Sequence, residues 1–216
     1  MSRTRVKICG VTRVEDALLA CELGADAIGM VMTPTSPRCV SIERARAIRD
    51  ALPGFVDAVV LTHGLPVETL RAIIDGVRPD LVQFHGSESA AFCDSCGVRY
   101  LKALGMAGDV DVRAIAAEHV HAAGFVLDGH PPGQQGGQGR VFDWSRVPHD
   151  LGRPILLAGG LNAGNVGDAI RTVHPWAVDL ASGVESSPGI KDAGKMRAFF
   201  AAVGNVDAGS SANEHN

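Results

Sequence analysis

Cys9 stands where a short apolar run gives way to glycine, and its thiol could carry out chemistry there. The stretch "VKICGVTRVEDAL" places Lys7 two residues before Cys9 and Gly10 directly after it. Alternate residues of a β-strand point to the same side, so the side chains of Lys7 and Cys9 face one way. A cation beside a thiol can lower the thiol pKa, and a thiolate serves as a general base or as a nucleophile. The alternative is that Cys9 is a small residue packed in the core.

Polar side chains also end other apolar runs of the chain. Asp128 ends "GFVLD", His85 follows "LVQF", and Asp179 lies within "VDLA". A carboxyl group in a partly apolar site has a raised pKa and can act as a general acid, which is one role for Asp128. A turn before the glycine-rich segment that follows is its other possible role. If Lys7 and Lys102 are buried, each needs an acidic partner, and Asp128 or Asp179 could serve Lys7.

Glycines follow the last two apolar runs. "LLAGGLNAGNV" contains Gly159 and Gly160, and "DLASGVESSPG" contains Ser182 and Gly183. Glycines let backbone N–H groups approach an anion closely, and the start of a helix adds its dipole. The two loops together indicate a phosphate site, and the alternative is a pair of tight turns.

Arg38 occupies a loop, "TPTSPRCV", that Pro34 and Pro37 stiffen. A guanidinium held on such a loop can bind a carboxylate through two parallel hydrogen bonds. A surface arginine in contact with solvent is the alternative.

The elements that must position these residues alternate regularly along the chain. Runs rich in β-branched residues predict strands at Val6–Cys9, Ala27–Met32, Val56–Leu61, Leu81–Phe84, Arg99–Ala103, Gly124–Asp128, Ile155–Ala158 and Val178–Ala181. Helical patterns lie between them at Val14–Leu23, Ile42–Ala51, Val67–Val77, Ser89–Cys96, Val112–His121, Asn165–Val173 and Ala193–Val203. Only a short turn near Trp144–Val147 follows the sixth strand.

This alternation requires a parallel sheet. Eight strand–helix units in 216 residues predict a single-domain α/β fold, the (β/α)8 or TIM barrel, over residues 1–204. An open doubly wound sheet is the alternative, and the lack of G-x-G-x-x-G after the first strand disfavours it. Barrels carry their active sites at the carboxyl ends of the strands, so the residues named above should meet there.

The predicted helices have recognisable ends. Thr12 with Glu15 three residues later predicts a capping box, and Gly24 should end that helix at the residue beyond its last turn. Ser41 is a suitable N-cap for the next helix.

The composition excludes several classes of protein. A net charge of −4 gives no basic bias for binding nucleic acid. No apolar run reaches the roughly 18 residues of a membrane span, and no apolar segment of a signal peptide follows the N-terminus, so we expect no membrane partner and a cytoplasmic location. Five cysteines, an odd number, argue against a disulfide framework, and "CDSC" (Cys93 and Cys96) lacks a second pair of zinc ligands.

Two segments differ from the rest in composition. Residues 129–140, "GHPPGQQGGQGR", predict a mobile loop over a site, and residues 205–216, "NVDAGSSANEHN", predict a disordered C-terminal tail. No clear exposed apolar stripe is evident, so we expect a monomer.

Six motifs, in order along the chain, together resemble the phosphoribosylanthranilate isomerase family of tryptophan biosynthesis. They are "KICGVTRVEDALLACELGADAIGMV" with "SPRCVS", "VQFHGSE", "LDG…GGQGRVFDW", "LAGGLNAGNV" and "VDLASGVESSPGIKD". The resemblance implies a (β/α)8 barrel and an Amadori rearrangement of a small phosphoribosyl substrate, N-(5-phosphoribosyl)anthranilate, without metal or organic cofactor. It implies that Cys9 is the general base and Asp128 the general acid, and that Arg38 binds the anthranilate carboxylate. It further implies a phosphate site at Gly159, Gly160, Ser182 and Gly183, with His85 and Asp179 as further site residues.

Three functions remain open at this stage. Besides the isomerase, the chain could be another phosphosugar barrel enzyme, such as an epimerase or an indole-glycerol-phosphate synthase, or a phosphate-ligand-binding barrel without catalysis. The synthase would need a different set of lysines and glutamates, and a binding protein would not need both Cys9 and Asp128. The chain departs from the family in "GMVMTPTSPR" and "DAVVLTHG", and Gln138 stands where threonine is common. These departures concern substrate packing and leave the proposed acid and base in place.

Overall fold

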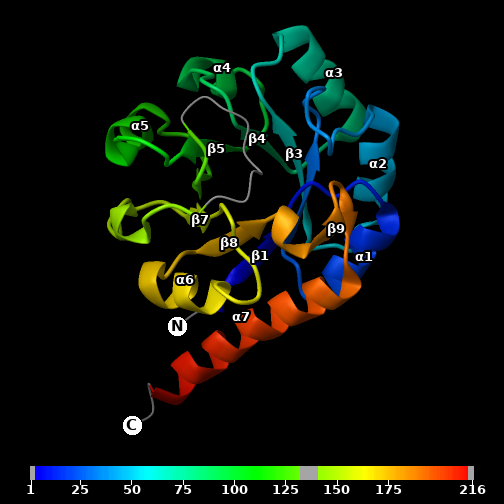
Figure 1. The fold of residues 1–216 in the computed structure, drawn as a ribbon. Coiled ribbons are helices and arrows are strands. Elements are labelled where there is room, and N and C mark those ends of the chain that lie inside the picture. Colours follow the sequence, from blue (N-terminus) through cyan, green and yellow to red (C-terminus); the bar gives the residue numbers. More distant parts are fainter. Residues whose placement is uncertain (1–2, 132–140, 214–216) are drawn as a thin grey trace.

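The computed structural model of the chain is a closed barrel of eight parallel strands, each hydrogen-bonded to the next, with the first paired to the last (Figure 1). The structure describes residues 3–131 and 141–213. The strands are β1 (Arg5–Ile8), β2 (Ala27–Val31), β3 (Asp57–Thr62), β4 (Leu81–Phe84), β5 (Tyr100–Gly105), β6 (Gly124–Asp128), β7 (Ile155–Leu157) and β8 (Ala177–Leu180). The predicted barrel is therefore confirmed, with strand ends within two residues of those expected.

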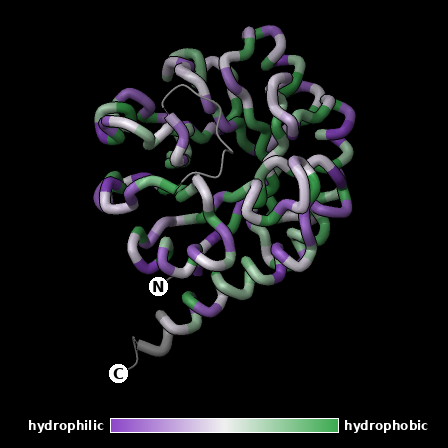
Figure 2. Tube along the Cα trace, in the orientation of Figure 1, coloured by the Kyte–Doolittle hydropathy of each residue, from purple (hydrophilic) through white to green (hydrophobic). Residues whose placement is uncertain are grey.

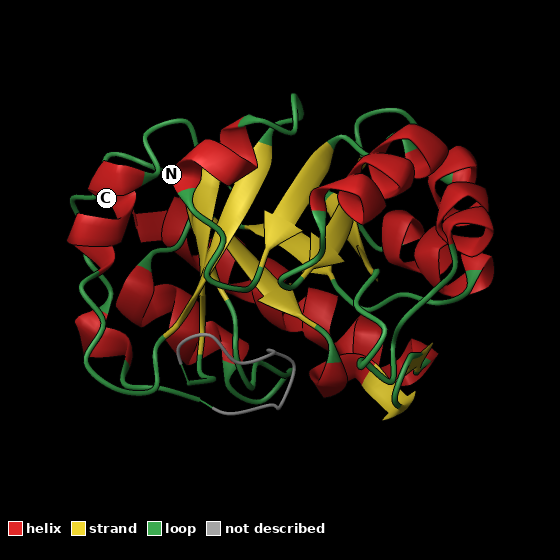
Figure 3. Ribbon diagram, turned by 90° about the horizontal axis from the view of Figure 1, so that it is seen from above, coloured by secondary structure: helices red, strands yellow, loops and turns green. Residues whose placement is uncertain are grey.

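Helices enclose the barrel on its outside, as Figures 1 and 3 show. They are α1 (Val14–Glu22), α2 (Ile42–Ala51), α3 (Val67–Val77), α4 (Ala90–Asp94), α5 (Val112–Glu118), α6 (Val166–Val173) and α7 (Ala193–Asn213). The 3-10 turn η1 (Trp144–Arg146) stands in place of a helix after β6, as predicted. A second 3-10 turn, η2 (Ser182–Val184), and a small hairpin of β9 (Glu185–Ser187) and β10 (Ile190–Lys191) lie between β8 and α7.

Two apolar layers share the strand residues between them. A large cluster, which includes Ile8, Ile28 and Phe125, packs between the strands and the helices. A second cluster, which includes Cys9 and Val126, fills the barrel interior. Figure 2 shows that the strands are mainly hydrophobic, whereas hydrophilic segments lie mostly at the periphery. Side chains alternate between the two faces of a strand, so every second residue of each strand points into the barrel interior.

Two of the three predicted helix ends are confirmed. The Ser41 hydroxyl accepts the N–H of Arg44 at 3.2 Å, and Gly24 adopts φ +103° beyond α1. The capping box at Thr12 is wrong, because the N-cap of α1 is Arg13 and makes no side-chain cap. Thr12 instead donates its hydroxyl to the carbonyl of Gly189 at 2.6 Å. The Thr12 hydroxyl therefore bonds to a distant loop and does not cap the helix that follows it.

The last helix is longer than the sequence predicted. We expected disorder from residue 205, whereas α7 continues to Asn213. Asp207 accepts both the N–H and the hydroxyl of Thr4, at 3.0 and 2.8 Å, and Val206 is buried. The polar composition of this segment concealed contacts that join it to the start of the chain. Residues 214–216, and 132–140 of the predicted mobile loop, lie outside the described residues.

Candidate active site

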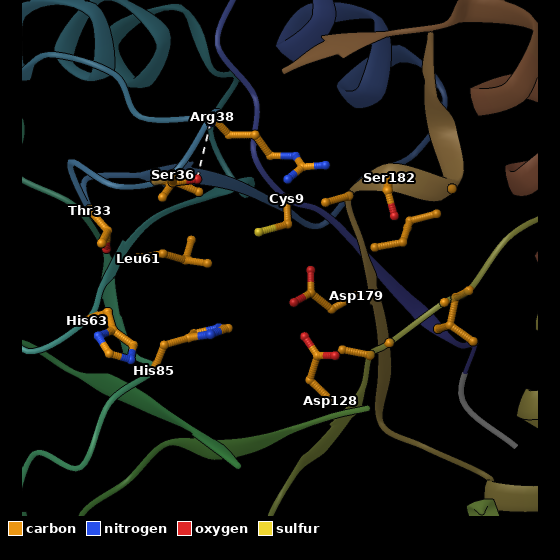
Figure 4. A pocket seen from close by; sticks show the side chains of 18 of the residues that line it. Cys9, Thr33, Ser36, Arg38, Leu61, His63, His85, Asp128, Asp179 and Ser182 are labelled. Atoms are coloured by element: carbon orange, nitrogen blue, oxygen red, sulfur yellow. Dashed lines mark hydrogen bonds between the residues drawn. The ribbon is translucent and has the colours of Figure 1, made fainter. Parts of the chain in front are cut away.

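An open cavity of about 700 Å³ lies at the carboxyl end of the barrel (Figure 4). Every site residue predicted from the sequence lines it: Cys9, Arg38, His85, Asp128, Gly159, Gly160, Asp179, Ser182 and Gly183. They come from loops and strand ends that are far apart in the sequence, and barrel closure brings them together.

Cys9 and Asp179 line this cavity, and the buried Lys7 lies beside them. Lys7 of β1 lies in register with Asp179 of β8, and its Nζ is 2.9 Å from Asp179 Oδ1. Both side chains are almost fully buried, at 2% and 6% exposure. The requirement for an acidic partner of Lys7 is therefore met by Asp179. Lys102 finds its partner in Glu88, at 3.1 Å, away from this group.

The pKa of the Cys9 thiol differs from the value expected from the sequence. Burial raises the pKa of Cys9 above its ordinary value, although Lys7 and Lys191 oppose the rise. Burial would lower the pKa of Lys7, but Asp179 and Cys9 outweigh it and hold that pKa above its ordinary value. The expected lowering of the thiol pKa is thus wrong. The ammonium of Lys7 remains charged beside the thiol and would favour the thiolate once it forms.

Glycines make room for both Cys9 and Arg38. A Cβ atom at Gly29 would lie 3.0 Å from Cys9 Sγ, which is too close. Gly10 has φ +68°, and a Cβ there would lie 2.5 Å from Arg38 Cδ. The glycine after Cys9 therefore does more than turn the chain, because it lets the Arg38 side chain cross over the end of β1.

Asp128 ends β6, and strands β7 and β8 separate it from β1 in the barrel. Its carboxyl group is buried and faces the same cavity as Cys9 and Asp179 (Figure 4). Its backbone carbonyl accepts the N–H of Met106 at 2.7 Å, which fixes the end of the strand. The thiol and this carboxyl group therefore reach one ligand from different walls of the cavity.

His85 lines the cavity and belongs to a buried polar group. Its Nε2 lies 2.5 Å from Nε2 of Gln83, and its ring stacks on that of His130 with centroids 5.7 Å apart. Burial, reinforced by the charges of His130, Lys7, His63 and Lys102, lowers the pKa of His85 to about 3. His85 is therefore a neutral imidazole that can exchange hydrogen bonds with a ligand.

We predict that His85 makes the protein sensitive to mild acid. An unfolded chain protonates His85 near its ordinary pKa of 6.5, whereas the folded chain resists protonation down to a pKa of about 3. The free energy of unfolding should therefore decrease as the pH falls through this window, by on the order of a few kcal/mol from this group. Urea denaturation of His85→Gln between pH 7 and pH 4 should show a shallower decrease than the wild type.

His149→Gln is the matched control, because it also removes one imidazole but from an exposed position. If His85→Gln retained the full wild-type slope of stability against pH, burial of a neutral His85 would not be its cause.

The loops after β7 and β8 adopt the geometry that anion binding requires. Gly159 and Gly160 have φ +88° and +67°. The side-chain amides of Asn162 and Asn165 both donate to the carbonyl of Gly160, at 3.2 and 3.0 Å. Because glycine has no side chain, the backbone N–H groups of this turn are open to close approach by a ligand. A phosphate accepts hydrogen bonds from such N–H groups.

Gly183 explains why the second loop also needs glycine. A Cβ atom at Gly183 would lie 1.9 Å from the carbonyl oxygen of Leu161, so the two loops pack backbone against backbone. Ser182 lines the cavity from the same loop. The two predicted phosphate loops thus form one continuous wall.

Sequence reasoning gave no role to Glu185 and Lys191, although both lie in a quoted motif. Arg38 donates from Nε and Nη2 to the two carboxylate oxygens of Glu185, at 2.8 and 2.7 Å. Lys191 Nζ lies 2.9 Å from Glu185 Oε1 and 2.5 Å from the carbonyl oxygen of Cys9. The Ser-Ser-Pro-Gly turn between these two charges is a hairpin signal that could have revealed the pair. Thr33, Ser36 and His63 also line the cavity and had not been singled out.

Within residues 3–131 and 141–213, no three His, Cys, Asp or Glu side chains are grouped so that they could hold a metal ion. All five cysteines are free thiols. In the same part of the chain, no helix has the length and apolar character needed to cross a membrane.

A (β/α)8 barrel with buried polar groups and glycine-rich loops at its carboxyl end has the architecture of the barrel enzymes. The family model for N-(5'-phosphoribosyl)anthranilate isomerase matches residues 6–202. The chain therefore belongs to the N-(5'-phosphoribosyl)anthranilate isomerase family.

Individual relatives agree with the family model. An isomerase of this name from Pseudomonas paraeruginosa is 53% identical over 203 residues, which are 94% of this chain and 96% of the relative. One from Xanthomonas oryzae pv. oryzae is 49% identical over 211 residues, or 95% of each chain.

Solved structures of the family share the fold. The crystal structure of the phosphoribosyl anthranilate isomerase from Thermus thermophilus has a TM-score of 0.85 and 38% identity, and the match covers 94% of this chain and all of the other. A second crystal structure, of an isomerase in complex with reduced 1-(o-carboxyphenylamino)-1-deoxyribulose 5-phosphate, has a TM-score of 0.79 and 36% identity over 94% of this chain and 99% of the other.

Proposed function

We propose that the chain isomerises N-(5-phosphoribosyl)anthranilate to 1-(2-carboxyphenylamino)-1-deoxyribulose 5-phosphate in tryptophan biosynthesis. The observation that carries the proposal is that the thiol of Cys9 and the carboxyl group of Asp128 face one cavity, beside the two glycine loops. This reaction is an aldose–ketose rearrangement, and it needs only proton transfers.

Asp128 opens the sugar ring. As the general acid, it protonates the ring oxygen of the furanose, and the C1–O bond breaks to leave a protonated Schiff base between C1 and the anthranilate nitrogen. Its position at the end of β6, with the carboxyl group facing the cavity, supports this role.

Cys9 then removes the proton from C2 of the Schiff base. The electrons of the C2–H bond form a C1–C2 double bond, and those of the C=N bond return to nitrogen, giving an enolamine. Proton transfer to C1 and loss of the hydroxyl proton at C2 produce the ketose. Lys7, paired with Asp179, supplies the positive charge beside the thiolate.

The remaining site residues hold the two charged ends of the substrate. Gly159, Gly160, Ser182 and Gly183 receive the phosphate, and Arg38 binds the anthranilate carboxylate. Binding of the charged group at each end holds the reacting atoms between Cys9 and Asp128. The reaction then benefits from proximity and orientation and does not depend on a random encounter.

The test is to supply phosphoribosylanthranilate to the purified protein and to follow the loss of its anthranilate-type fluorescence. We expect rapid turnover without added metal or cofactor, and unchanged rates in the presence of a chelator. A folded protein that caused no fluorescence loss would instead favour another phosphosugar enzyme or a binding protein.

Replacing Arg38 should weaken substrate binding more than catalysis. Charge-assisted hydrogen bonds to a carboxylate contribute about 1.5–3 kcal/mol, so Arg38→Ala should raise KM about tenfold to a hundredfold. Arg38→Lys keeps the charge but lacks the paired donors, and it should restore only part of the affinity. Steady-state kinetics measure both effects. An unchanged KM and kcat in Arg38→Ala would remove Arg38 from the site.

We further propose that the protein acts as a monomer in the cytoplasm, on a small-molecule substrate and without nucleic acid or membrane partners. Sedimentation equilibrium would measure its mass in solution, and a dimer would correct the first of these statements.

A further inference from the structure

Glu185 begins β9 at the edge of the cavity and is nearly fully buried, at 4% exposure. Its carboxylate accepts hydrogen bonds from Arg38 Nε and Nη2, from Lys191 Nζ and from the N–H of Gly189, the last at 3.2 Å. A carboxylate with this many donors has a fixed position and orientation. Glu185 is therefore a rigid reference point beside the cavity.

Lys191 ties this carboxylate to the catalytic strand. Its ammonium group is completely buried and donates to Glu185, to the carbonyl of Cys9 and to that of Ala181, at 2.9, 2.5 and 3.2 Å. The two carbonyls stand at the ends of β1 and β8. The position of Glu185 is thus set relative to the residue that carries the thiol.

The arginine is bound along one edge only. Glu185 occupies the Nε–H and one N–H of Nη2, and within residues 3–131 and 141–213 Arg38 Nη1 makes no hydrogen bond. The edge formed by Nη1 and the second Nη2 hydrogen remains for another acceptor. Figure 4 shows the guanidinium of Arg38 close to Cys9 in the cavity view.

The charges also leave room for a second carboxylate. Arg38 and Lys191 contribute two positive charges, and Glu185 contributes one negative charge. Hydrogen bonds from Arg38 and Lys191 outweigh burial and keep the pKa of Glu185 below its ordinary value, so it stays ionised. One positive charge therefore remains at the cavity edge, and an anionic ligand group would neutralise it.

We infer that Glu185 is a positioning residue that orients Arg38, so that only the Nη1/Nη2 edge of the guanidinium is presented to the aryl carboxylate of the substrate. This inference rests on the proposed function. Glu185 acts through Arg38 and does not touch the reacting atoms. Its role is to select a substrate whose aromatic amine carries a carboxylate at a fixed place relative to Cys9.

The experiment compares Glu185→Gln with the wild type on two substrates. One is phosphoribosylanthranilate, and the other is the corresponding phosphoribosylaniline, which lacks the carboxylate. Because the amide cannot accept all of the donors, Arg38 loses its orientation, and kcat/KM for the first substrate should fall about tenfold or more, mainly through KM. For the aniline substrate the fall should be less than about twofold, because no carboxylate is there to bind.

Three further variants separate positioning from stability. Glu88→Gln breaks another buried ion pair, that with Lys102, and should not discriminate between the two substrates. Arg38→Ala combined with Glu185→Gln should be no worse on phosphoribosylanthranilate than Arg38→Ala alone, since Glu185 acts only through Arg38. Glu185→Asp retains the charge and should recover part of the lost affinity.

Equal losses on both substrates, or additive effects of the two substitutions, would overturn the inference about Glu185 and leave the proposed function intact. A wild-type protein that failed to turn over phosphoribosylanthranilate would overturn the proposed function, and the inference with it.

Discussion

Cys9→Ala should reduce turnover of phosphoribosylanthranilate by about a thousandfold or more, because general-base catalysis typically contributes about 10²–10⁴-fold and no other described side chain replaces the thiol on β1. The loss should appear in kcat, since in the proposed mechanism the thiol acts on the C2–H bond and not on the charged ends of the substrate. With deuterium at C2, the variant should show a large kinetic isotope effect, because proton removal becomes the slow step.

The pH profile of the wild type provides a second measurement. Burial raises the pKa of Cys9, so the free enzyme holds a protonated thiol at neutral pH. The reactive thiolate increases as the pH rises, and kcat/KM should therefore increase from neutral into alkaline solution. The residual activity of Cys9→Ala should lack this increase.

Cys93→Ala is the matched control, because Cys93 is also a buried thiol but lies on α4 in the outer apolar layer. It should keep near-wild-type turnover. Circular dichroism should show that both variants retain the fold. Activity of Cys9→Ala within a few-fold of the wild type would show that the thiol is not the base.

Asp128→Asn should cause a loss of similar size, about 10²–10⁴-fold in kcat, because the amide cannot protonate the ring oxygen. In this variant ring opening becomes the slow step, so the isotope effect from deuterium at C2 should fall close to one. The isotope effects of the two variants should therefore move in opposite directions, which distinguishes acid from base.

Asp57→Asn is a suitable comparison, since Asp57 begins β3 at the other end of the barrel. It should leave kcat and KM unchanged. If Asp128→Asn instead showed the larger isotope effect, the roles of acid and base would have to be exchanged.

The residues that the sequence identified best are those at strand ends. Cys9, Asp128 and the glycines of the last two loops were found because barrel topology places every strand end at one rim. Likewise, the i and i+2 spacing predicted that Lys7 faces the same side as Cys9, and both are buried. Local pattern and global topology agree at these positions, so the pattern was reliable.

What the sequence could not predict depends on contacts between distant segments. The pKa of Cys9 follows from burial as well as from the neighbouring lysine, and the degree of burial is a property of the folded barrel. The hydroxyl of Thr12 bonds to the carbonyl of Gly189 instead of capping α1. The polar C-terminal segment is helical, and there Asp207 accepts a hydrogen bond from the distant Thr4. The pairing of Glu185 with Arg38 joins residues 147 apart, a distance that no motif spans.

The bond between Lys191 and the carbonyl of Cys9 has a consequence for how the protein is made. It joins positions 182 residues apart, the end of β1 and the strand β10 of the hairpin that follows β8. During synthesis, the strand that precedes Cys9 leaves the ribosome long before β10 does, and Cys9 lacks this neighbour until then. A growing chain should therefore carry no complete site, and activity should arise only after β10 has emerged.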